Sequence, residues 1–151
     1  MSWANIIVLA ACALSLYAAW ADFRKFTIRN GLVLALAGLF VVHALLVGQW
    51  SDLKWDLAFA GLMFVLLLVL YAMGGMGGGD VKLLAVAFLW TGMAAAMPFA
   101  VTLAVLTVLH GAAAKLGWVG TAPASDGRLR IPYAPSIAGA LVVAMGLRFL
   151  A

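Results

Sequence analysis

The sequence contains no glutamate, a single cysteine and very few charged residues. Charged residues make up 9% of its 151 positions, whereas soluble domains contain about 25%. Hydrophobic residues make up 68%, and the mean hydropathy is +1.18. Because a soluble fold cannot hide so much apolar surface, this composition excludes an ordinary soluble domain. We therefore expect one domain, residues 1–151, lying almost entirely within a membrane.

The other scarcities exclude further classes of site. Cys12 has no second cysteine for an internal disulfide, and no paired-cysteine spacing indicates a metal or redox centre. The net charge of +4 is not accompanied by a basic stripe with interleaved aromatic residues, so we expect no nucleic-acid partner. In a membrane protein such an excess indicates topology and contact with anionic lipid. The expected surroundings are the lipid bilayer, and no cofactor or metal is expected.

Long hydrophobic runs account for most of the chain. A transmembrane helix needs about 20 apolar residues, and six segments reach or approach that length. The apolar stretch 83–116 would measure about 51 Å as one helix, against a hydrocarbon core of about 30 Å, so we divide it at Pro98. Strands are excluded, because an open sheet cannot satisfy its edges in lipid. The predicted fold is an all-α polytopic membrane protein with about six transmembrane helices. The expected bounds are 3–21, 31–48, 57–73, 83–98, 99–116 and 131–150.

The basic residues are divided unequally between the two sides of this bundle. Only Lys54 and Arg148 fall on one side, and seven others follow the first, third and fifth segments. By the positive-inside rule the richer side is cytoplasmic, so we expect both termini on the non-cytoplasmic side. The seven residues are Arg24, Lys25, Arg29, Lys82, Lys115, Arg128 and Arg130.

A cleavable signal peptide is the alternative interpretation of the first segment, because Ala19-Trp20-Ala21 resembles a cleavage site. No lysine or arginine precedes the apolar core, however, and the core is long for a signal. We expect the segment to be retained as a helix.

The five aspartates can be considered one by one. Asp22 follows the first segment and Asp80 follows the third, so both are expected at the cytoplasmic edge. A carboxylate at a membrane is costly and is usually functional or paired. Asp52 and Asp56 lie in a polar loop on the opposite side, where we expect them to be solvated. Asp126 is expected in a turn.

Two neighbouring carboxylates can act as one catalytic unit. They share a proton, so that one activates a water as general base while the other donates a hydrogen bond to the scissile carbonyl. No other motif competes: G-x-S-x-G and HExxH are absent, and we interpret His43 and His110 as packed helix residues. Two alternatives remain open. Asp80 could serve only as the N-cap of the next helix, or the two aspartates could form the ion or proton site of a non-catalytic transporter or assembly subunit.

The surroundings of both aspartates resemble a known family. Residues 77–84 (GGGDVKLL) fit the GxGD motif of membrane aspartic peptidases, in the GxGDxKLL form of type IV prepilin peptidases. Residues 22–30 (DFRKFTIRN) resemble that family's first-aspartate motif, in which basic residues and then Ile-Pro-Asn follow the Asp. Residues 131–138 (IPYAPSIA) resemble its Pro-Tyr-Gly-rich start of the final span. GxGD alone is a weak signal, but three motifs in the same order are a strong one.

Two residues depart from the family pattern. Arg29 stands where the family usually has proline, which puts the rigidity of that loop in doubt, and Ala134 replaces the usual glycine. The loop 22–30 is too short for the methyltransferase region of longer members, so N-methylation is not expected. The chain is most similar to short members that serve tight-adherence (Flp-type) pili.

The resemblance implies a membrane-embedded aspartic endopeptidase that cleaves the short cytoplasmic leader of type IV prepilins and pseudopilins after a glycine. Asp22 and Asp80 would be the catalytic pair in a bacterial inner membrane, facing the cytoplasm. Glycines permit close approach of another backbone, so Gly77, Gly78 and Gly79 are candidate substrate contacts. Lys82 is a further candidate, although it can also be a positive-inside anchor.

Overall fold

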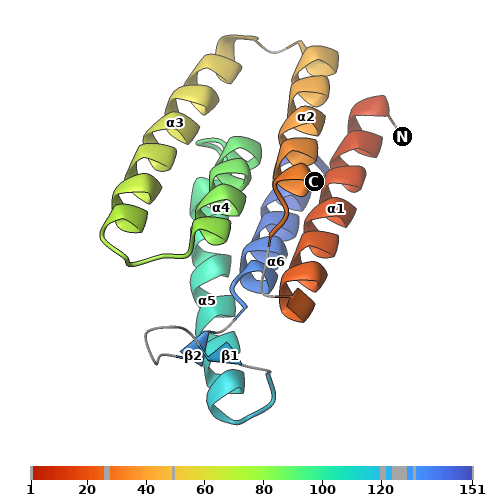
Figure 1. Cartoon of the computed structure of the whole chain (residues 1–151). Coiled ribbons are helices and arrows are strands. Elements are labelled where there is room, and N and C mark those ends of the chain that lie inside the picture. Colours follow the sequence, from red (N-terminus) through yellow and green to blue (C-terminus); the bar gives the residue numbers. More distant parts are fainter. Residues whose placement is uncertain are drawn as a thin grey trace.

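A computed structural model describes residues 2–25, 28–48, 50–119, 122–123, 129–130 and 132–150. Over these residues the expected all-α bundle is confirmed, and successive helices run in alternate directions (Figure 1). A short antiparallel pair, β1 (Ala122–Pro123) with β2 (Leu129–Arg130), precedes the last helix. The helices are α1 (Trp3–Lys25), α2 (Asn30–Val47), α3 (Trp50–Ala72), α4 (Gly78–Thr91), α5 (Ala96–Lys115) and α6 (Ala134–Met145), which continues as the π-helix η1 (Gly146–Leu150).

The helices differ in length from the expected spans. Among the described residues, α1, α2, α3 and α5 are long and apolar enough to cross a membrane, whereas α4 has 14 residues and the apolar helix 134–150 is also shorter. The division of the stretch 83–116 into two helices is confirmed, but the turn between them begins at Gly92, where φ is 54°, and α5 already includes Pro98. The expected start of the last segment at Ile131 and the turn at Asp126 lie outside the described residues.

The start of α3 corrects one prediction. The helix begins at Trp50, so the stretch expected to be a polar loop is its first turns, and both Asp52 and Asp56 are helical. Ser51 and Asp52 suggested a loop because they are polar. Both residue types are also favoured at the start of a helix, where free N–H groups and a positive partial charge stabilise them.

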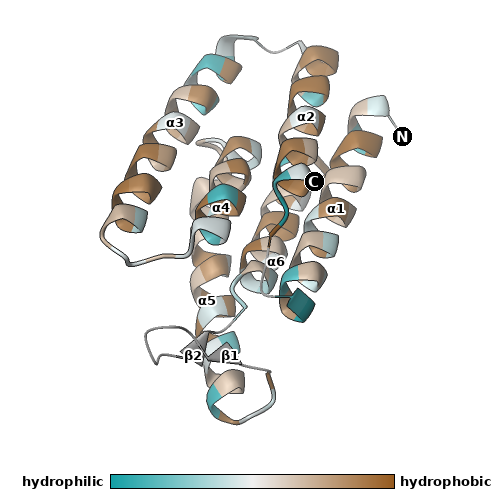
Figure 2. Cartoon of the chain, viewed as in Figure 1, coloured by the Kyte–Doolittle hydropathy of each residue, from teal (hydrophilic) through white to brown (hydrophobic). Residues whose placement is uncertain are grey.

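The two shorter helices lie inside the bundle. α4 packs against α2, α3 and α6, and α6 packs against α1 and α5 as well. Trp90 and Leu83 of α4 and Ile137 and Leu141 of α6 are fully buried. The longer helices instead expose many apolar side chains. Their ribbons are coloured mostly as hydrophobic in Figure 2. Because neighbouring helices shield α4 and α6 from lipid, these two need not match the full thickness of the hydrocarbon core.

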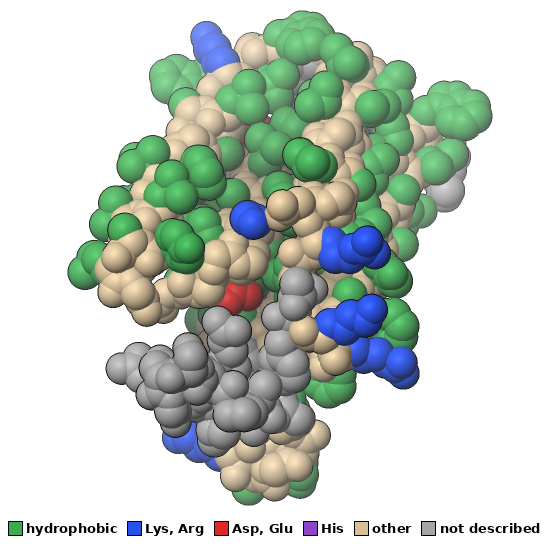
Figure 3. Space-filling view, in the orientation of Figure 1, with side chains coloured by type: hydrophobic (Ala, Val, Ile, Leu, Met, Phe, Trp, Pro, Cys, Tyr) green, Lys and Arg blue, Asp and Glu red, His purple; other side chains and the backbone are tan. Residues whose placement is uncertain are grey.

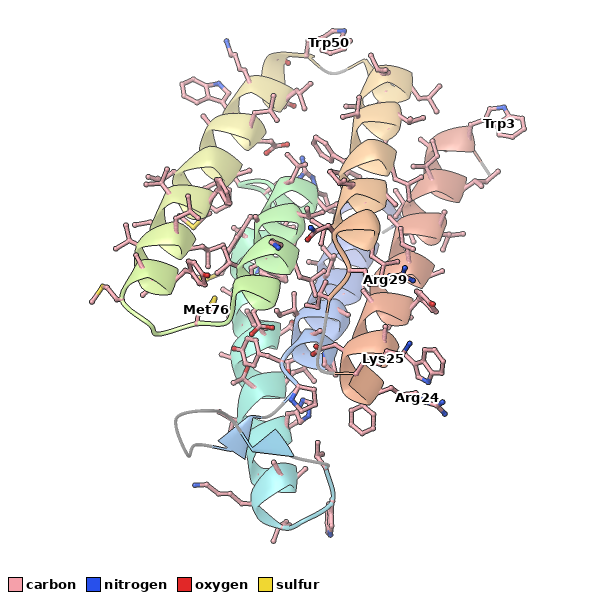
Figure 4. The ribbon with its side chains drawn as sticks, viewed as in Figure 1. Trp3, Arg24, Lys25, Arg29, Trp50 and Met76 are labelled. Carbon is pink, nitrogen blue, oxygen red and sulfur yellow. The ribbon has the colours of Figure 1, made fainter. Side chains whose placement is uncertain are left out.

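The bundle has two chemically different ends. Arg24, Lys25 and Arg29 lie where α1 ends and α2 begins, and Trp3 and Trp50 lie at the opposite end (Figure 4). We call these the basic end and the tryptophan end. Lysine and arginine side chains also gather toward the basic end on the face drawn in Figure 3. The division agrees with the expected topology, while the side of the membrane on which each end lies stays a prediction.

Candidate active site

Asp22 lies near the end of α1, at the basic end, and its residue is only 6% exposed. Its Oδ2 accepts a hydrogen bond of 3.3 Å from the backbone N–H of Ala134, the first residue of α6. The first N–H groups of a helix have no partner within the helix, and the positive end of the helix dipole attracts a carboxylate. Because α6 packs against α1, Asp22 therefore receives a hydrogen bond from a residue that is distant in the sequence.

Asp80 lies in the first turn of α4 and is partly buried. Gly77, not Asp80, is the N-cap residue, so the interpretation of Asp80 as the N-cap is wrong. A methyl group added at Gly77 would lie 3.1 Å from Asp80 Oδ2, which shows how closely this carboxylate folds back over the glycine. Any other residue at this position would require the carboxylate to shift by a few tenths of an ångström. The first turn of a helix also favours a carboxylate electrostatically.

The connection between α1 and α2 is fastened to the start of α4. Ile28 is buried, and its side chain lies 3.6 Å from the position that a Cβ of Gly79 would occupy. Lys82 Nζ donates a hydrogen bond of 2.9 Å to Asn30 Oδ1. The segment that follows Asp22 is therefore attached to the segment that carries Asp80.

The three motifs singled out in the sequence thus meet at the basic end. Asp22 contacts the third motif through Ala134, and Ile28 and Asn30 contact the second through Gly79 and Lys82. Direct contact between the two carboxylates stays a prediction. The candidate substrate contacts Gly78 and Gly79 are the first two residues of α4. The space beside Gly78 is bounded by the ring of Tyr71. Phe26 and Thr27 of the first motif lie outside the described residues.

Polar contacts between α5 and α6 escaped the sequence analysis. Thr107 Oγ1 donates a hydrogen bond of 2.8 Å to the hydroxyl of Tyr133, and His110 Nδ1 lies 3.2 Å from Ser136 Oγ. His110 was expected only to pack within its helix. No local pattern predicts these pairs, because the tertiary packing of two helices selects them.

The tryptophan end contains a buried aspartate, Asp56, and the prediction for this residue was wrong. Asp56 was expected to be solvated, but it is 7% exposed and forms an ion pair with Arg148 of η1. The same carboxylate accepts a hydrogen bond of 3.1 Å from the N–H of Met93, and Arg148 donates one of 2.9 Å to the carbonyl of Trp90. Because α3 begins early, it turns Asp56 inward toward these partners. Asp52 is exposed, as expected.

The interpretation of His43 as a packed helix residue is confirmed. It is buried, and its ring packs against those of Trp90 and Phe149 at the tryptophan end. A cavity of about 60 Å³ lies beside His43 and the Asp56–Arg148 pair. Within the described part of the chain, no three His, Cys or Asp side chains are grouped as metal ligands.

These features define a polytopic helical membrane protein with a buried aspartate, Asp22, and a partly buried aspartate, Asp80, at the same end. A family model described as the type IV leader peptidase family matches residues 9–113, more than half of the chain. The chain belongs to the type IV leader peptidase family. The matched region contains both Asp22 and Asp80 and ends before α6. Searches of curated proteins and of solved structures gave no match.

Proposed function

We propose that this leader peptidase is an aspartic endopeptidase that removes the short cytoplasmic leader of type IV prepilins or pseudopilins. In this proposal the enzyme resides in the bacterial inner membrane and its site faces the cytoplasm. The observation that carries the proposal is the position of the two aspartates. Both belong to the family-matched region, both lie at the basic end, and their segments are fastened together through Lys82 and Asn30.

Asp22 and Asp80 act on a water in the proposed mechanism. One carboxylate removes a proton from the water as it attacks the scissile carbonyl, and the other, protonated, donates a hydrogen bond to the carbonyl oxygen. When the tetrahedral intermediate collapses, the peptide C–N bond breaks and the leaving amine takes up a proton. Asp22 suits this role because its carboxylate, which has about four acceptor sites, has a single hydrogen-bond partner among the described residues.

The substrate is proposed to approach the start of α4. Gly77, Gly78 and Gly79 carry no side chains, so an extended peptide can come close to their backbone. Lys82 is exposed beside them, and we propose that it adds to this contact while it holds Asn30. A prepilin has a basic leader followed by an apolar helix, so the junction between the two reaches the membrane edge where these residues lie.

The proposed peptidase domain comprises the whole chain, 1–151. The family match ends at residue 113, but α6 provides the N–H donor to Asp22 and much of the buried core. A chain without α6 would lose both.

The test is co-expression with candidate prepilins, with the substrate's size followed on a gel. The wild type is expected to shorten its substrate, and Asp22→Asn and Asp80→Asn to leave it intact while still inserting into the membrane. Asp52→Asn is the matched control, because Asp52 is exposed at the other end, and it should cleave normally. Normal cleavage by either active-site variant would refute the assignment of that residue. If the wild type cut no prepilin, the substrate class would be wrong and an ion or proton site would become the alternative.

A further inference from the structure

Side chains of α5 contact the residues before and after Ala134, whose N–H donates to Asp22. Tyr133 immediately precedes Ala134 and accepts the hydrogen bond of Thr107, whereas Ser136 follows it and meets His110. We call the four residues Thr107, His110, Tyr133 and Ser136 the α5–α6 clamp. The clamp encloses the backbone segment that supplies the donor to Asp22.

The spacing of the clamp fixes the register of the two helices. Thr107 and His110 are three positions apart on α5 and lie on one helix face. Tyr133, the N-cap residue of α6, and Ser136 in its first turn are also three positions apart. Two contacts separated by about one turn oppose both sliding and rotation of α6. Pro135, which has no N–H and a restricted φ, lies between them and stiffens the same turn.

His110 has an energetic cost that packing does not explain. Its Nε2 is buried and has no hydrogen-bond partner within the described part of the chain. A buried polar atom without a partner is destabilising, and an apolar side chain of similar size would avoid the penalty. The contact of Nδ1 with Ser136 is the interaction that an apolar residue could not make.

We propose that Thr107 and His110 are positioning residues for the cleavage reaction. Acting through Tyr133 and Ser136, they hold the Ala134 N–H at Asp22 and so fix the orientation of that carboxylate. The inference rests on the proposed function, because it takes Asp22 as a catalytic group. Since the substrate is proposed to approach the start of α4 and not α5, the loss of either residue should lower kcat and leave KM unchanged.

The kinetic test uses the purified full chain in detergent and a synthetic peptide containing a basic leader, a glycine and the start of an apolar helix. Thr107→Val should lower kcat roughly tenfold, with KM within about twofold, because misplaced catalytic groups cost rate and not binding. Thr107→Ser keeps the hydroxyl and should retain the wild-type kcat. Thr102→Val, the same change elsewhere on α5, is the matched control and should also retain it.

His110 gives a second readout that a structural role would not produce. His110→Leu should lower kcat while the unfolding temperature stays the same or rises, since the unpaired Nε2 is removed. His110→Asn places an amide near the position of Nδ1 and should restore part of the lost kcat. A fall in kcat that accompanies a fall in unfolding temperature, with no rescue by Asn, would overturn the proposal.

A spectroscopic measurement follows the donor itself and does not depend on cleavage. The chain has three tyrosines, Tyr17, Tyr71 and Tyr133, and each precedes an alanine. Labelling tyrosine carbonyl carbons with ¹³C and alanine nitrogens with ¹⁵N therefore selects three amides, of which Ala134 is the one expected to shift in Asp22→Asn. The same amide should shift in Thr107→Val but not in Thr102→Val. An unmoved Ala134 amide in Thr107→Val overturns the clamp, whereas a moved amide without any wild-type cleavage counts against the proposed function alone.

Discussion

Asp22 and Asp56 are buried to nearly the same degree, 6% and 7% exposed, but at opposite ends of the bundle and with different partners. Asp56 is bound by Arg148 and by the N–H of Met93. Asp22 has one backbone N–H at 3.3 Å and, in the described part of the chain, no cation within ion-pair distance. Burial alone therefore does not distinguish the proposed catalytic carboxylate from the ion-paired one. The two carboxylates differ in the number of cations and hydrogen-bond donors that the described part of the protein provides to each.

The pair at the tryptophan end joins three parts of the fold. Asp56 belongs to α3, Met93 to the turn after α4, and Arg148 to η1, whose guanidinium also binds the carbonyl of Trp90. A buried charge is tolerated when a partner and hydrogen bonds satisfy it, and its removal leaves the partner uncompensated. Asp56 is thus a structural residue, whereas the carboxylate of Asp22 has only the Ala134 N–H as a hydrogen-bond partner among the described residues.

The largest expected effect contrasts the two aspartates directly. Asp22→Asn should reduce cleavage by about 10²–10⁴-fold, the range for loss of a general acid or base, without lowering the unfolding temperature. Asp56→Asn should lower the unfolding temperature and leave the cleavage rate of the folded fraction near that of the wild type. Quantitative cleavage assays and thermal unfolding of both variants test this prediction. Equal effects of the two variants on stability would contradict the distinction.

The second prediction concerns the partner of Asp56. Arg148→Met should destabilise the protein by about 3–5 kcal/mol, the cost of leaving a buried charge unpaired. Denaturant unfolding in detergent, followed by tryptophan fluorescence, measures the change. Lys54→Met is the control, because Lys54 is exposed at the same end and should have little effect. Adding Asp56→Asn to Arg148→Met should recover part of the loss, since the stranded carboxylate is then neutral.

A smaller effect is expected at Gly92, in the turn after α4. Its φ is positive, and a methyl group there would overlap both Asp56 and Arg148. Gly92→Ala should therefore destabilise the fold by about 1–3 kcal/mol through backbone strain and displacement of the ion pair. Gly111→Ala has open space around its Cβ and serves as the control in the same unfolding experiment. Equal stability of the two variants would show that the turn does not hold the pair.

The smallest expected effect is at the basic end. Lys82→Met removes an exposed hydrogen bond to Asn30, and such bonds contribute about 1 kcal/mol or less. We expect a few-fold loss of cleavage from a less firmly held connection between α1 and α2. Asn30→Ala removes the same hydrogen bond but keeps the proposed substrate contact of Lys82, so it should lose less, and the double variant should lose no more than Lys82→Met. Fully additive losses would mean that Lys82 and Asn30 act separately.

Much of this arrangement could be predicted from local sequence. Hydropathy located six helices, and the number of crossings before each aspartate placed Asp22 and Asp80 at one end. The bounds of the fourth helix were wrong: the expected segment was 83–98, whereas α4 spans Gly78–Thr91, because hydropathy does not reveal that the glycines before Asp80 begin the helix. The pairing of Asp56 with Arg148 spans 92 positions, and no local pattern reports it. Ala134 contributes a backbone group, which the identity of its side chain does not reveal.

The link between Asp22 and Ala134 also has a consequence for biosynthesis. The two residues are 112 positions apart. The carboxylate of Asp22 in α1 therefore gains its N–H donor only after α6 has been synthesised and has packed against α1. A nascent chain still lacking α6 already contains both aspartates, yet it cannot complete the arrangement around Asp22. In the proposed mechanism, the order of synthesis thereby prevents hydrolysis at Asp22 until the bundle around it has been assembled.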